Sequence, residues 1–304
     1  MRYIAPTTAH GHSGPARGLT RRRDEQLARY RAAVPAVLPD LSSDYEVPAD
    51  RIDEFAREGH TVLRAVCTSD EIAAYRPVIE AATRKHTTET RPIEARDTYS
   101  KAFLQVTNLW VHDEGVRRFV TARRFAKIAA ELMGVAGVRL YHDQALFKEA
   151  GGGHTPWHQD QFYWPFDSDR TITMWMPLVD VSAEIGTMTF AAGTHKLGYL
   201  GKFGISDESH AAFQALVEER GIELRTHGEA AAGDATFHAG WTLHRAAANP
   251  TGNLRSVMTV IYFADGLRAT QPDHGFRWHD LRTWLPGVEP GEPAASPLNP
   301  RLYP

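Results

Sequence analysis

The chain has 304 residues, of which 42% are hydrophobic and 23% charged, so it can bury a full core as one large domain or two small ones. A formal net charge of −3 gives no sign of nucleic-acid binding, and no apolar run approaches the roughly 20 residues of a membrane span. The single cysteine, Cys67, rules out an internal disulfide and favours a cytoplasmic location. These features indicate a globular protein with a small-molecule partner, and they do not determine its oligomeric state.

The N-terminal part of the chain divides into a polar arm and a helical region. Residues 1–20 are small, polar and rich in Gly and Pro, which predicts a flexible arm. Helices are predicted over 21–33, 47–58, 68–86 and 117–132, with one strand over 61–66. Gly59 and Gly134 stand where helices usually end, and Thr68 with Glu71 forms a capping-box pattern.

From residue 138 onward the chain consists of short β-type runs separated by Gly, Pro and Asp. Strands are predicted over 138–148, 155–163, 171–181, 187–191, 235–238, 243–247 and 255–264, with one helix at about 209–220. This order favours an α+β protein with a mainly β core, a double-stranded β-helix or jelly roll with flanking N-terminal helices. We expect one domain over 21–304: helical support over about 21–134, the jelly-roll core over about 138–265, and an irregular C-terminal wrap over 266–304.

The first chemical signal is the pattern His158-Gln159-Asp160, which lies in the predicted strand 155–163. Side chains alternate between the faces of a strand, so His158 and Asp160 are expected to point the same way. A second histidine would complete the two-histidine, one-carboxylate triad that is typical of non-haem Fe(II) oxygenases. Two further His-x-acid matches are set aside: the one at His112 lies where a helix should begin, and the one at His227 contains a glycine and lies too close to His244 to draw on a separate sheet.

The second signal is His244, followed eleven residues later by Arg255 at the start of a predicted strand. A buried arginine needs an anionic partner, because an unpaired buried charge is costly. Its planar guanidinium pairs well with a carboxylate. A dicarboxylate co-substrate that binds a metal at one end and Arg255 at the other would meet both needs.

These residues, together with Ala192-Gly193-Thr194-His195-Lys196, resemble the phytanoyl-CoA dioxygenase family of Fe(II)/2-oxoglutarate-dependent oxygenases, over roughly residues 53–265. The resemblance implies that the catalytic iron is bound by His158, Asp160 and His244. It also implies that Arg255 binds the distal carboxylate of 2-oxoglutarate and that Gln144 and Trp175 line the 2-oxoglutarate site.

The substrate pocket is predicted from two groups of residues. The resemblance places Lys101 and Gln105 near the pocket, and closeness to the expected iron favours Phe162, Trp164 and Trp241. Other histidines, among them His142, His154 and His238, are interpreted as hydrogen-bonded structural residues rather than ligands.

The implied reaction uses O₂ and converts 2-oxoglutarate to succinate and CO₂ while the substrate is hydroxylated. The same cofactor chemistry also allows epimerisation, desaturation or cyclisation. Asp160 argues against halogenation, since halogenating relatives carry a small residue there. The absence of a Lys/Arg cluster around the site disfavours an acyl-CoA, whereas the aromatic surroundings favour a natural-product substrate. The alternatives are a zinc hydrolase, in which Arg255 would have no role, and a non-catalytic cupin-like binding protein.

Overall fold

The computed structural model describes residues 37–182 and 185–304. The predicted arm over 1–20 and the predicted helix over 21–33 lie outside these residues. Within the described part, no helix is both long and apolar enough to cross a bilayer.

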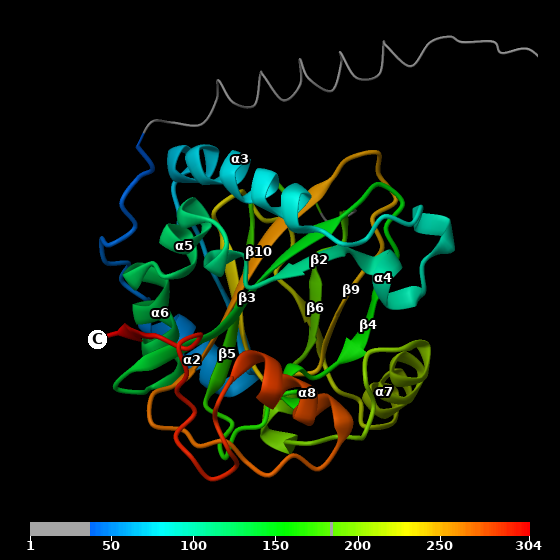
Figure 1. Ribbon diagram of the computed structural model, residues 1–304. Helices are drawn as coiled ribbons and strands as arrows, with labels where there is room; N and C mark the ends of the chain where they lie inside the picture. The colour runs from blue at the N-terminus through cyan, green and yellow to red at the C-terminus, as the bar shows by residue number, and fades with distance from the viewer. Residues whose placement is uncertain (1–36, 183–184) are drawn as a thin grey trace, which may run out of the picture. The chain divides into compact units, whose positions relative to one another are not determined.

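Two antiparallel sheets form the centre of the region from residue 38 to residue 304 (Figure 1). Among the described residues, the larger sheet has the strand order β1-β8-β5-β10-β3-β11, and β2 pairs with β3 beside this path. Its strands are β1 (His60–Leu63), β2 (Leu104–Thr107), β3 (Val138–Lys148), β5 (Thr171–Pro177), β8 (Ala235–Ala239), β10 (Arg255–Ala264) and β11 (Arg301–Tyr303). The smaller sheet has the order β4-β9-β6-β7, with β4 (Thr155–His158), β6 (Met188–Ala191), β7 (Leu224–Thr226) and β9 (His244–Ala246).

Helices flank both sheets. The helices that precede β3 are α2 (Ala49–Glu58), α3 (Ser69–His86), α4 (Thr98–Ala102), α5 (Glu114–Val120) and α6 (Arg123–Met133). The later helices are α7 (Asp207–Glu219) and α8 (Gly275–Trp284). Figure 1 shows α5 and α6 beside the larger sheet and α7 beside β4. This arrangement is the predicted jelly roll with N-terminal helices.

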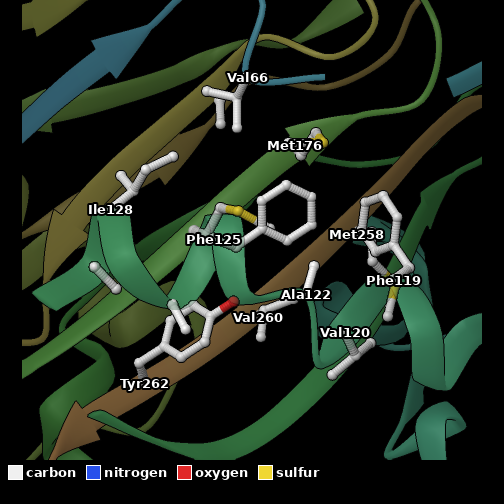
Figure 2. Packing of buried hydrophobic residues seen from close by; sticks show 14 of the residues in the cluster. Val66, Phe119, Val120, Ala122, Phe125, Ile128, Met176, Met258, Val260 and Tyr262 are labelled. Carbon is white, nitrogen blue, oxygen red and sulfur yellow. The ribbon is translucent and has the colours of Figure 1, made fainter. Parts of the chain in front are cut away.

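Helices α5 and α6 bury their apolar faces against the larger sheet (Figure 2). Phe119 and Phe125 are fully buried and pack with Met258 and Val260 of β10. These two residues of β10 point to the helices, whereas Thr259 between them lines the cavity on the other face of the sheet. Each fully buried phenylalanine contributes on the order of 2–3 kcal/mol, so this packing holds β10 firmly.

The predicted helix ends are confirmed at three positions. Gly59 and Gly134 adopt left-handed conformations, with φ of 80° and 65°, directly after α2 and α6. The hydroxyl of Thr68 accepts from the backbone N–H of Glu71 at 3.2 Å, and the Glu71 carboxylate accepts from the backbone N–H of Thr68 at 2.8 Å. These contacts satisfy N–H groups that the first turn of α3 would otherwise leave unpaired.

Several predicted boundaries are wrong. The predicted strand 155–163 ends at His158 and continues as a 3₁₀ turn, η3 (Asp160–Phe162). The predicted helix 117–132 is two helices, because the chain turns at Thr121 and Ala122. The segment 266–304, predicted to be irregular, contains α8 and β11. The short strands β2 and β7 were not predicted, since they are too short to show a clear alternation.

Candidate metal centre and co-substrate site

Two histidines become neighbours through the pairing of two short strands. His158, at the end of β4, lies directly opposite His244, the first residue of β9. Side chains that face each other in an antiparallel pair have Cβ atoms roughly 5 Å apart. The ring centroids of the two histidines are 4.1 Å apart. The turn η3 then brings Asp160 back to the same point.

The potential ligand atoms of His158, Asp160 and His244 converge. Oδ1 of Asp160 lies 3.5 Å from Nε2 of His158 and 3.8 Å from Nε2 of His244. One ligand atom from each residue lies within 4.8 Å of the others. Metal–ligand bonds of about 2.0–2.2 Å place neighbouring ligand atoms roughly 3 Å apart, so this set fits one metal ion after a small inward shift.

The hydrogen bonds of both imidazoles leave Nε2 available to a metal. Nδ1 of His158 donates to the carbonyl oxygen of Pro156 at 2.8 Å. Nδ1 of His244 donates to the carbonyl oxygen of Thr242 at 2.9 Å. A metal-binding histidine usually donates its other ring N–H in this way, which fixes both tautomer and ring orientation.

The second oxygen of Asp160 has partners of its own. Oδ2 accepts from the hydroxyl of Thr173 at 2.9 Å and lies 3.1 Å from Nε2 of His238. Burial alone would raise the pKa of Asp160, but the neighbouring imidazoles of His244, His158 and His238 hold it well below its usual value. His238 is thus a hydrogen-bonded residue beside the candidate metal site.

A cavity of about 530 Å³ opens beside the triad. Of the residues predicted to contact 2-oxoglutarate or substrate, Gln105, Gln144, Trp175 and Arg255 line this cavity. Gln144 and Trp175 lie opposite Thr259 on the two strands that flank β10. One row across the sheet therefore carries three cavity-lining side chains.

Arg255 is buried with part of its guanidinium unsatisfied. The side chain is 2% exposed, and Nη1 donates to the carbonyl oxygen of Gly186. Its Nε is buried and has no hydrogen-bond partner among the described residues. The guanidinium lies 5.4 Å from the ring centre of Trp175, and burial lowers its pKa to about 10. A carboxylate in the cavity would satisfy both the charge and the free donor.

Four predicted pocket residues lie outside the cavity lining. Trp164 packs with the cluster of Tyr141 and Phe166, and Trp241 contacts Tyr199 in a shallow hollow elsewhere. Phe162 stacks on His274, with ring centroids 4.4 Å apart. The backbone carbonyl of Lys101 accepts from Gly153. Closeness in sequence to Asp160 was a poor guide, because η3 turns Phe162 and Trp164 away from the metal side.

Other residues line the cavity that the sequence interpretation did not select. Those from α4, β3, the end of η3 and α8 include Tyr99, His142, Tyr163, Phe276, Asp280 and Trp284. One signal was available: the aromatic and acidic positions 276, 280 and 284 are four residues apart, as on one face of a helix.

A model of the phytanoyl-CoA dioxygenase family matches residues 55–257. The ectoine dioxygenase of Stutzerimonas stutzeri (strain A1501) is 22% identical over 259 residues, which cover 79% of this chain and 85% of that protein. A Stutzerimonas stutzeri protein described as "Probable alpha-ketoglutarate-dependent hypophosphite dioxygenase" is 22% identical over 154 residues; the match covers 49% of this chain and only 54% of that protein.

Two solved structures are also similar. The alpha-ketoglutarate-dependent carbocyclase SnoK from nogalamycin biosynthesis has a TM-score of 0.70 and 22% identity, covering 84% of this chain and 96% of its own. The epimerase SnoN in complex with Fe³⁺, alpha-ketoglutarate and nogalamycin RO has a TM-score of 0.66 and 28% identity, covering 83% of this chain and 97% of its own.

The fold, the family match and the relatives define a non-haem Fe(II)/2-oxoglutarate-dependent dioxygenase. The chain belongs to the phytanoyl-CoA dioxygenase family.

Proposed function

We propose that His158, Asp160 and His244 bind Fe(II), that Arg255 binds the distal carboxylate of 2-oxoglutarate, and that the enzyme hydroxylates a small natural-product substrate. One observation carries the proposal. Nε2 of His158, Oδ1 of Asp160 and Nε2 of His244 converge at a cavity that Arg255 also lines, and Nε of Arg255 has no hydrogen-bond partner among the described residues. Three protein ligands on one side of a metal leave positions for a co-substrate and O₂.

The iron, when bound with 2-oxoglutarate and O₂, supplies the oxidising chemistry that attacks a substrate C–H bond. The residues of this chain position the iron and the co-substrate. The Nδ1 hydrogen bonds of His158 and His244 hold their Nε2 atoms towards one point. Gln144 and Trp175 line the same cavity as the triad and Arg255, and we propose that they restrict how the co-substrate lies.

The substrate is proposed to enter from the side of the cavity formed by α4 and α8. Aromatic side chains, including Tyr99, Tyr163 and Trp284, line this side together with polar groups, which suits a scaffold of mixed polarity. The carbocyclase and the epimerase named above act in the biosynthesis of a natural product. At 28% identity to the epimerase, epimerisation is the second candidate outcome.

A zinc hydrolase explains the site less well. It accounts for three ligands and a bound water, but it gives no purpose to a buried arginine whose Nε lacks a partner. A non-catalytic binding protein would not require the two oriented imidazoles. A cytoplasmic location remains a prediction, based on the single buried cysteine, Cys67.

The test compares the wild type with His244→Ala and with the control His154→Ala, whose ring packs against His210 instead of the triad. Wild type and control are expected to bind Fe(II) and to form succinate from 2-oxoglutarate in an O₂-dependent manner. His244→Ala should lose at least about tenfold in Fe(II) affinity, because one of three ligands is removed. Equal Fe(II) affinity in all three proteins would refute the ligand assignment.

Mass spectrometry of products from candidate substrates then separates the outcomes. A gain of one oxygen indicates hydroxylation, an unchanged mass with altered retention indicates epimerisation, and a loss of two hydrogens indicates desaturation or cyclisation. Succinate formation without O₂ consumption would contradict the oxygenase proposal itself.

A further inference from the structure

Helix α8 presents one face to the cavity. Phe276, Asp280 and Trp284 are spaced four residues apart, so they lie above one another on the helix, and all three line the cavity. Phe276 is 51% exposed, whereas Asp280 is 7% exposed. The face therefore runs from an exposed aromatic residue to a buried carboxyl group.

The carboxyl group of Asp280 has neutral donors as partners. The Tyr141 hydroxyl donates to Oδ2 at 3.0 Å, and the ring N–H of Trp284 donates to the same carboxyl group. In the described part of the chain, no lysine, arginine or histidine forms an ion pair with Asp280. A buried carboxylate without a cation is costly to ionise, and burial raises the pKa of Asp280 to about 7.

A β-bulge places Tyr141 in reach of Asp280. Ile261 pairs with His142, but the next residue, Tyr262, pairs with Leu140, so Tyr141 is an extra residue in β3. The rings of Tyr141 and His142 therefore approach each other, with centroids 4.7 Å apart, although adjacent side chains normally point to opposite faces. Bulges often redirect a side chain next to an active site.

Strand register places the β3 residues beside Asp280 in the same row across the sheet as Thr173, and it places Arg255 farther along β10. Thr173, which binds Asp160, pairs with Ile261, and Ile261 pairs with His142. His142 is thus two strands from Thr173, about 10 Å at the usual strand spacing. Arg255 lies six residues from Ile261 along β10, which is roughly 20 Å. The residues around Asp280 and the residue that holds Asp160 therefore lie at the same level of the sheet, and Arg255 lies at a different level.

The pKa shifts of two tyrosines are consistent with Asp160 and Asp280 lining the same cavity. Burial raises the pKa of Tyr163 to about 12, and the negative charges of Asp160 and Asp280 both add to this rise. Burial likewise raises the pKa of Tyr99, and both carboxyl groups add to this rise. His142 does not supply a cation, because burial lowers its pKa to about 3.

We propose that Asp280 binds a protonated amine of the substrate, so that the enzyme acts on ammonium-bearing molecules. The inference rests on the proposed function in taking this cavity as the substrate site. An ammonium group would compensate the buried carboxylate, whereas a hydroxyl group would leave its charge unpaired. The aromatic rings of Tyr99, Tyr163 and Trp284 around the same space favour a cation.

The test measures binding of 2-phenylethylammonium and of its neutral counterpart 2-phenylethanol to the anaerobic Fe(II)/2-oxoglutarate form, by calorimetry or ligand-detected NMR. The wild type is expected to bind the ammonium at least about tenfold more tightly than the alcohol, because only the ammonium pairs with the buried charge. Asp280→Asn should abolish this preference. The matched control Asp273→Asn, which changes an exposed carboxylate just before α8, should keep it.

If the Asp280→Asn variant fails to fold, the same inference is tested by measuring the affinities of the wild type for both compounds at different pH values. Asp280 gains a proton as the pH falls through about 7. An alkylammonium stays charged, so its affinity should drop between about pH 8 and about pH 6, while that of the alcohol stays constant. The groups around Asp280 are Tyr141 and His142 from β3, Tyr99 from α4, Tyr163 at the end of η3, and His279 and Trp284 from α8; His279 is exposed.

The inference is wrong if the ammonium binds the wild type no better than the alcohol does, or if neither compound binds at millimolar concentration. It is also wrong if the Asp280→Asn variant still prefers the ammonium. The visible charge-transfer band of the same samples separates the two claims. A normal band without an ammonium preference contradicts only the substrate class, and a preference without the band contradicts only the proposed function.

Discussion

At the scale of single residues, Asp160 divides its two oxygens between different tasks. Oδ1 faces the Nε2 atoms of His158 and His244, while Oδ2 accepts from Thr173 and contacts His238. The second set of contacts fixes the rotation of the carboxylate. Removal of a partner of this kind typically lowers metal affinity by about 10–100-fold.

Thr173→Val tests this division of roles. Valine keeps the shape of threonine at this buried position, but it removes the hydroxyl that donates to Oδ2. We expect the affinity for Fe(II), measured by anaerobic titration, to fall about tenfold. The control Thr121→Val, which removes a hydrogen bond to the backbone of α5, should bind Fe(II) like the wild type. An unchanged affinity in Thr173→Val would show that Asp160 is held by other contacts.

At the scale of elements, the position of Arg255 depends on the packing on the opposite face of its strand. β10 alternates between residues that pack under α5 and α6, such as Met258 and Val260, and residues that face the cavity, such as Thr259. A one-residue shift of β10 would exchange the two sets. The apolar contacts of α6 therefore secure the register that carries Arg255 into the site.

The substitution Phe125→Ala tests how much the packing of α6 against the sheet contributes to stability. Phe125 is fully buried on α6, and its truncation should lower the free energy of unfolding by about 3–5 kcal/mol, as determined by denaturant titration. Leu197→Ala, at a side chain that is 47% exposed, should change it by no more than about 0.5 kcal/mol. A loss below about 1 kcal/mol for Phe125→Ala would indicate that α6 does not secure the sheet.

Sequence patterns predicted the long elements better than the short ones. The alternation over 255–264 predicted β10 with its observed bounds, and the capping box predicted the start of α3. The turn η3 was hidden because three residues carry no periodicity. The bulge at Tyr141 depends on pairing between β3 and β10, which no local pattern shows.

At the scale of the whole molecule, the candidate site joins residues from distant parts of the chain. The spacing of His158, Asp160, His244 and Arg255, together with the family resemblance, selected them from the sequence. The substrate side was not predictable in this way, because Asp280 reaches the cavity only when α8 folds back onto the jelly roll. The four-residue spacing of positions 276, 280 and 284 indicates one face of a helix, but it does not show which part of the protein that face contacts.

The central claim is that one cavity binds both a metal through the triad and a dicarboxylate through Arg255. Anaerobic titration of the Fe(II)-loaded protein with 2-oxoglutarate measures this directly through the visible metal-to-ligand charge-transfer band. The wild type and the control Arg282→Met, which changes an exposed arginine on α8, should both develop a band that saturates at equal amounts of co-substrate and protein. Arg255→Met should bind Fe(II) normally but require at least about thirtyfold more 2-oxoglutarate, since it loses the buried charge pair. A wild type that binds Fe(II) without developing the band, or an Arg255→Met variant with unchanged 2-oxoglutarate affinity, would contradict the account.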